Sequence, residues 1–111
     1  MLLDFCYNQI MYKIKKDKYQ KARGGNSRVL EISCEGCTSH LTYYQKDGPG
    51  LLKRMYVDRC IDNIPNGNEW TCFSCKRALG NLINYKKEDR PAYRLYVGAV
   101  SKKIVRARDI A

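Results

Sequence analysis

Short apolar segments separated by polar turns follow one another along most of the chain. Between Val29 and Ser33 the apolar residues Leu30 and Ile32 alternate with polar ones, which is typical of a strand with one buried face. Other segments rich in β-branched, aromatic and leucine residues predict four more strands, at 41–45, 51–57, 82–87 and 92–100. Residues 69–71 form a further short β segment, and 102–105 fit an edge strand within a basic tail. The pattern predicts a small, mainly β, antiparallel domain.

Turn-forming residues separate the strands and predict two hairpins. The segment 46–50 contains Gly48, Pro49 and Gly50, which supply the backbone angles of a tight reversal. A second turn at 88–91 ends in Pro91. The polar loop 62–68 lies between the two hairpins and divides the predicted β region into two units.

The first 28 residues differ from this pattern. Up to Ile14 the apolar side chains recur at roughly helical spacing, and Lys13 to Arg23 is then almost continuously basic before a Gly-Gly-Asn-Ser break. The sequence supports two interpretations of the start. Residues 1–10 are a dispensable extension before a second natural start at Met11, or they belong to an amphipathic helix that docks on the sheet. We divide the chain into 1–28, a basic N-terminal arm or short helix, and 29–111, the β domain.

The charge of the chain narrows the class of partner. Its 111 residues fit one domain and carry a net charge of +10, from 21 Lys and Arg against 11 Asp and Glu. The arm is the denser part, with seven basic and two acidic residues in 1–28. A basic surface favours a polyanion such as nucleic acid. No segment approaches the roughly 20 apolar residues of a membrane span, and the N-terminus lacks the basic region of a secretory signal, so we expect a cytoplasmic protein without a membrane partner.

Four of the six cysteines occur in two Cys-x-x-Cys pairs: Cys34, Cys37, Cys72 and Cys75. Each pair can supply two corners of a tetrahedron, and four thiolates complete the coordination sphere of Zn²⁺. We therefore predict one structural zinc ion. The competing uses are a disulfide framework and thiol redox chemistry. The absence of a secretory signal argues against the first, and a redox pair normally stands at a helix start in a βαβ unit.

The residues around the cysteine pairs suggest an internal duplication. Both pairs read Cys-x-x-Cys-x-x-x-Leu and continue with Tyr, Lys-acid, Pro and finally Arg-apolar-Tyr-Val. We predict two knuckle-plus-hairpin repeats, at about 34–57 and 72–97, related by an approximate twofold about a shared zinc ion. Neither unit is large enough to bury a core by itself.

These knuckles and hairpins resemble the zinc-ribbon class of small β domains. The resemblance covers roughly 29–100, and its specific residues are the four paired cysteines and the small or apolar residues after them. Glycine commonly follows the second cysteine of a ribbon knuckle, whereas this chain has Thr38 and Lys76 there. Zinc ribbons occur in transcription, translation and nucleic-acid-processing proteins and as protein-docking modules. The resemblance thus implies a binding role without catalysis.

The remaining cysteines and the single histidine lack a catalytic context. His40 could replace a cysteine ligand, but its counterpart in the second unit is Ala78, so we expect a hydrogen-bonded or solvated loop residue. Cys60 follows an apolar strand and is expected to be a buried small hydrophobe. Cys6 has no partner motif. We expect no enzymatic activity and no small-molecule substrate.

Strand alternation suggests a nucleic-acid surface. If Met55, Val57, Leu95 and Val97 face the core, then the side chains on the other face are Arg54, Tyr56, Arg94 and Tyr96. Arginine suits phosphate and exposed tyrosine stacks on unpaired bases. The alternative is that the tyrosines and the arginine stems cover the sheet and each other.

Two further basic groups are candidates for phosphate contact. Lys76 and Arg77 follow the second knuckle and either offset the charge of the thiolates or bind phosphate. The arm contributes Lys13, Lys15, Lys16 and Lys18. We predict a zinc-stabilised nucleic-acid-binding module, with RNA or a ribonucleoprotein favoured. The first alternative is a protein-docking subunit of a larger complex, and the second is a thiol oxidoreductase.

Overall fold

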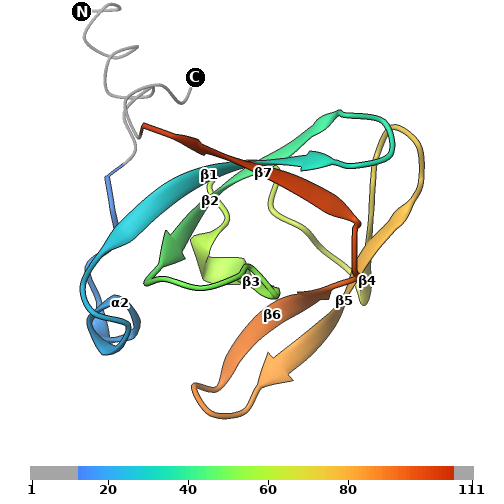
Figure 1. The fold of residues 1–111 in the computed structure, drawn as a ribbon. Helices are drawn as coiled ribbons and strands as arrows, with labels where there is room; N and C mark the ends of the chain where they lie inside the picture. Colours follow the sequence, from blue (N-terminus) through green and yellow to red (C-terminus); the bar gives the residue numbers. More distant parts are fainter. Residues whose placement is uncertain (1–12, 107–111) are drawn as a thin grey trace, which may run out of the picture.

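Seven strands form two antiparallel sheets in the computed structural model, which describes residues 13–106 (Figure 1). The first sheet has the order β2-β1-β7, from β1 (Ser27–Cys34), β2 (His40–Asp47) and β7 (Val100–Val105). The second has the order β3-β6-β5-β4, from β3 (Arg54–Tyr56), β4 (Glu69–Thr71), β5 (Ala78–Tyr85) and β6 (Arg90–Leu95). A short helix α2 (Lys18–Ala22) and a 3-10 turn η1 (Val57–Arg59) complete the described elements. The prediction of a small, mainly β fold is confirmed.

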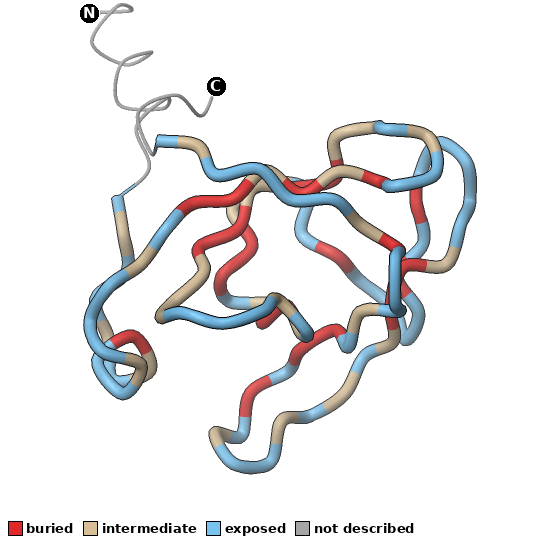
Figure 2. The backbone as a smooth tube through the Cα atoms, in the orientation of Figure 1, coloured by how far each residue is buried: buried red, intermediate tan, exposed pale blue. Residues whose placement is uncertain are grey.

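Both sheets contribute residues to the hydrophobic core, and the buried residues are coloured red along the backbone in Figure 2. The first sheet contributes Leu30, Ile32, Leu41 and Tyr44, and the second contributes Met55, Trp70, Leu79 and Tyr93. Ile32, Met55 and Leu79 have no exposed surface at all. Burial of these side chains is the main favourable term for a domain of this size.

Each cysteine knuckle connects the two strands of an antiparallel hairpin. β1 pairs with β2 around the first knuckle, and β4 pairs with β5 around the second. The pairings Ser33 with His40 and Thr71 with Ala78 occupy the same place relative to the cysteines, and a register shift precedes each. The two knuckle hairpins therefore have the same pairing pattern, which is what the predicted duplication requires of them.

The hairpin predicted after the first knuckle is wrong. β2 pairs with β1, and β3 pairs with β6 of the other sheet, so 41–45 and 51–57 do not form a ladder together. The corresponding hairpin of the second unit exists, because β5 pairs directly with β6. Lys46 and Asp47 of the predicted turn belong to β2, and a turn sequence does not determine which strand becomes the partner of the next one.

The basic segment before β1 is docked on the domain. The backbone N–H of Lys15 donates to Gln45, and the Gln45 amide donates back to the Lys15 carbonyl. Asp17 caps α2 and pairs with the buried Arg59, at 2.6 Å between carboxylate and guanidinium. A five-residue helix is too short to persist alone, so these contacts hold it in place.

Residues 1–12 and 107–111 lie outside the described residues, and the prediction that 1–10 are dispensable falls there. Within 13–106 no helix combines the length and hydropathy that crossing a membrane requires.

Candidate metal centre and basic groove

The two knuckles bring four thiols together at the junction of the two sheets. The Sγ atoms of Cys34 and Cys75 are 3.7 Å apart, those of Cys37 and Cys72 are 3.6 Å apart, and all four lie within 4.8 Å of one another. Sulfur ligands at about 2.3 Å from Zn²⁺ stand about 3.8 Å from each other in a tetrahedron. The four cysteines therefore fit a tetrahedral metal ion, plausibly zinc.

Equivalent hydrogen bonds shape both knuckles. The N–H groups of Cys34 and Cys72 donate to the carbonyls of Ser39 and Arg77, both at 2.9 Å. In each pair, the backbone N–H of the residue that follows the second cysteine donates to the carbonyl of the first cysteine. Those two residues, Thr38 and Lys76, have φ of 63° and 66°. They occupy the left-handed region at the position where the resembling class commonly carries glycine.

The thiols differ in exposure and in hydrogen bonding. Cys34 and Cys72 are completely buried, Cys37 is half-buried and Cys75 is exposed. A hydrogen bond with the Ser39 hydroxyl lowers the pKa of Cys37 to about 6. For Cys75 a backbone hydrogen bond with Arg77 is outweighed by desolvation and the neighbouring thiols, which raise its pKa to about 11. A lowered thiol pKa favours the thiolate, which is the form that ligates a metal ion.

Arg77 crosses from the second knuckle to the first. A Cβ placed on Gly36 would stand 3.0 Å from an Arg77 nitrogen and 3.7 Å from the Cys34 sulfur. Arg77 also donates to the Gly98 carbonyl at 3.4 Å. These contacts place its charge beside the sulfurs. Lys76 donates to the Phe73 carbonyl within its own knuckle.

His40 stands apart from the thiols. Its two ring nitrogens lie 2.9 Å from carboxylate oxygens of Glu31 and Asp62, and the cysteine cluster of the described residues does not include it. Burial lowers the pKa of His40, but the two carboxylates outweigh it and raise that pKa above 6.5. The prediction of a hydrogen-bonded histidine is confirmed, but His40 begins β2 and does not lie in a loop. Cys60 is buried as predicted, and burial raises the pKa of its thiol to about 12.

Two adjoining cavities form a basic groove beside β7. They have volumes of about 760 and 590 Å³ and share Leu51, Leu52 and Lys102 in their walls. Six basic residues line them: Arg28, Lys46, Lys53, Arg54, Arg94 and Lys102. No acidic residue does. We call this surface the basic groove.

The groove unites only part of the predicted nucleic-acid surface. Arg54, Arg94 and Tyr96 line it together, as expected. Lys76 and Arg77 belong to the second knuckle, and the four arm lysines lie on the docked segment before β1. Lys15 donates to the Asp58 carbonyl, and the Lys18 ammonium lies 5.1 Å from the Tyr19 ring centroid.

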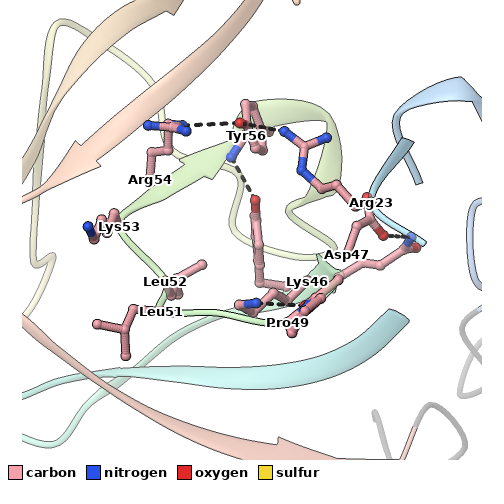
Figure 3. A pocket seen from close by; sticks show the side chains of 12 residues that line it. Arg23, Lys46, Asp47, Pro49, Leu51, Leu52, Lys53, Arg54 and Tyr56 are labelled. Atoms are coloured by element: carbon pink, nitrogen blue, oxygen red, sulfur yellow. Dashed lines mark hydrogen bonds between the residues drawn. The ribbon is translucent and has the colours of Figure 1, made fainter. Parts of the chain in front are cut away.

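The expected outward orientation of Tyr56 is wrong. Its side chain is 8% exposed, and its hydroxyl accepts hydrogen bonds from Arg23 and Arg54 (Figure 3). The docked segment and Arg90 cover the sheet face on which Tyr56 lies. The alternative, that tyrosine and arginine cover the sheet and each other, describes this residue. Val97 is also opposite to expectation, since it is fully exposed.

Sequence patterns missed four basic residues of the groove. Arg28, Lys46, Lys53 and Lys102 come from separate strands and loops and share no motif. Their convergence depends on the pairing of β7 with β1 and of β3 with β6.

Comparisons of the chain with protein-family models, with curated proteins and with solved structures found no match. The likeness to zinc ribbons therefore rests on the two knuckles and the geometry of their thiols.

Proposed function

We propose that this protein is a non-enzymatic, metal-stabilised module that binds nucleic acid along the basic groove, with single-stranded RNA as the favoured ligand. The observation that supports it most is the groove wall, with six cations and no carboxylate. A surface with positive charge alone attracts a polyanion, and it disfavours partners that are basic or carry no negative charge.

Apolar side chains between the cations favour a single strand over a duplex. Leu51, Tyr96, Val97 and Ile104 line the groove and are among the exposed large apolar residues of the described chain. A duplex presents phosphates and sugars at its surface, whereas a single strand also offers the apolar faces of its bases. Cations with interspersed apolar and aromatic side chains match both parts of a single strand.

The test is a binding titration of metal-loaded protein with a labelled single-stranded RNA over a series of salt concentrations. The triple variant Arg28→Gln, Lys53→Gln and Lys102→Gln should bind more weakly. The slope of log affinity against log salt should become shallower by about 2, since each phosphate contact contributes about 0.7 for a single strand.

A matched control removes three charges elsewhere. Lys21, Lys86 and Lys87 are exposed and do not line the groove. Their substitution by Gln should leave most of the affinity and the salt slope in place. Equal losses in the two triple variants would show that net charge alone drives binding, and the groove would have no special role.

A second candidate function is protein docking. Phe73 stands at the tip of the second knuckle and is 66% exposed, which is unusual for so large an apolar side chain. Docking through such a contact would depend little on salt. If RNA does not bind and a partner is captured equally at low and high salt, with loss on Phe73→Ser, docking replaces nucleic-acid binding.

A further inference from the structure

Arg54 and Arg94 stand directly opposite each other on neighbouring strands. They are register partners in the β3–β6 ladder. The N–H of Leu95 donates to the Lys53 carbonyl, which makes 53 and 95 the hydrogen-bonded pair. Arg54 and Arg94 are thus a non-hydrogen-bonded pair, the kind in which opposing side chains come closest. The next pair, Met55 with Tyr93, is buried in the core, so the arginines share the opposite face of the sheet.

Both side chains are cationic and start from directly opposed backbone positions. Like charges directly across an antiparallel ladder destabilise it. The other arginines of this region are neutralised: Arg23 by Glu88, Arg59 by Asp17 and Asp47, and Arg90 by Asp58 and Glu88. Among residues 13–106 neither Arg54 nor Arg94 has an acidic partner.

The closest carboxylate in the same row of the sheet does not compensate the pair. The row continues from Arg94 to Asn81 of β5 and then to Glu69 of β4. Glu69 is therefore two strands from Arg94, or about 10 Å. It accepts a hydrogen bond from the Tyr96 hydroxyl at 3.1 Å.

The Arg54 side chain is held in place before any ligand binds. Its Nε donates to the Tyr56 hydroxyl at 3.1 Å (Figure 3). Its guanidinium carbon lies 4.0 Å from the centroid of the Tyr85 ring. These contacts use Nε and one flat face. The two terminal nitrogens have no acceptor within the described part of the chain. Arg94 is exposed and lines the same 590 Å³ cavity.

We infer that Arg54 and Arg94 form a clamp for one phosphate group. Guanidinium groups bind phosphate oxygens through paired charge-assisted hydrogen bonds, and two of them match a group with several anionic oxygens. The bound anion offsets the repulsion between the arginines. The inference rests on the proposed function, since a backbone phosphate of a strand in the basic groove is the expected source. A free phosphate carries the same chemistry.

The first measurement uses inorganic phosphate and metal-loaded protein. The thermal midpoint of the wild type should rise with phosphate relative to chloride at equal ionic strength. Arg94→Gln should show a slightly higher midpoint in chloride, because the repulsion is gone, and no specific phosphate effect. Arg28→Gln, a groove variant outside the clamp, should respond to phosphate as the wild type does. Equal phosphate responses of the wild type and Arg94→Gln would overturn the clamp.

The second measurement separates the clamp from the groove. With single-stranded RNA, Arg94→Gln should raise Kd roughly tenfold, the effect of losing one hydrogen-bonded charged contact. Arg54→Lys keeps the charge but loses the planar guanidinium that donates two parallel hydrogen bonds, and it should also weaken binding. If Arg94→Gln binds as the wild type does while the triple groove variant fails, the clamp is wrong and the groove stands. If RNA does not bind the wild type but phosphate stabilises it through Arg94, the proposed function is wrong and free phosphate is the ligand.

Discussion

Tyr56 is the centre of a stack of aromatic and cationic side chains. The Arg90 guanidinium carbon lies 4.0 Å from the centroid of the Tyr19 ring and 3.8 Å from that of Tyr56. Tyr85 meets Tyr56 edge-on at 5.9 Å between centroids. Arginine between two aromatic faces is favourable when water is excluded. This Tyr–Arg stack uses a residue that alternation alone would have placed in solvent.

The Tyr56 hydroxyl should be worth measurable stability. Tyr56→Phe removes the acceptor for Arg23 and Arg54 and should lower the free energy of unfolding by about 1 kcal/mol, as loss of a partly buried hydrogen bond does. Urea unfolding of metal-loaded protein measures the change. Tyr85→Phe is the control, because no hydrogen bond of the Tyr85 hydroxyl is found in the described residues. Equal losses for the two variants would contradict the role of the hydroxyl.

Thr38 is strained in its knuckle. A β-branched residue at φ 63° is unfavourable, whereas glycine adopts this conformation freely. Thr38→Gly should raise the free energy of unfolding by less than about 1 kcal/mol. Relief of the left-handed penalty is partly offset by the extra entropy of the unfolded glycine and by loss of the hydrogen bond from the Thr38 hydroxyl to the Cys37 carbonyl. Equilibrium unfolding with the metal bound measures the change. Thr71→Gly, at the end of β4 and without a positive φ, should instead be destabilising, and a loss at both positions would show that Thr38 carries no strain.

At the scale of elements, polar side chains fix the segments that the ladders do not hold. Asp17 joins the helix α2 to η1 through an ion pair with Arg59. The pKa of Asp17 is lowered to about 2, and the hydrogen bond from Arg59 is the largest cause. Asp62 accepts hydrogen bonds from Thr42 and from the Tyr43 N–H, which fastens the loop after η1 to β2. His40 adds a bridge from Asp62 to Glu31 of β1. Three elements therefore meet at one histidine.

The histidine bridge should make stability depend on pH. The folded-state pKa of His40 is raised above 6.5, so its contribution is fully present below about pH 6.5 and is lost as the pH rises through the folded pKa. The free energy of unfolding of the wild type should fall more steeply above pH 6.5 than that of His40→Gln. Unfolding titrations of both proteins with bound metal measure the difference between the two profiles. If the two proteins lose stability in parallel from about pH 6, just below the ordinary histidine pKa, to about pH 9, the bridge is contradicted.

At the scale of the whole molecule, the four-thiol cluster lies where the two sheets meet. Cys34 ends β1 of the first sheet, and Cys72 directly follows β4 of the second. One ion bound to both knuckles would therefore cross-link the two sheets. Metal-binding free energy in such domains is folding free energy.

Cys72→Ser should abolish metal binding and cooperative folding. The expected cost exceeds the stability of a small domain, since structural zinc sites contribute on the order of 10 kcal/mol. Elemental analysis and circular dichroism melts, with and without a chelator, measure it. Cys60→Ser changes a buried cysteine outside the cluster and should keep one metal ion per chain. Cooperative unfolding of metal-free Cys72→Ser with a wild-type midpoint would show that the ion does not hold the fold together.

The sequence by itself determined the features that depend on near neighbours. Alternation predicted most of the strands because it is set by local backbone geometry. The two Cys-x-x-Cys pairs predicted the four-thiol cluster because each pair supplies two ligands and a tetrahedral metal ion takes four. Only the tertiary structure decided that β3 pairs with β6, that Tyr56 is covered by a docked segment, and that Arg28, Lys53 and Lys102 line one groove. Those outcomes depend on contacts between residues far apart in the chain. The packing energy that selects among such contacts is shared by the whole core and leaves no pattern in any one segment.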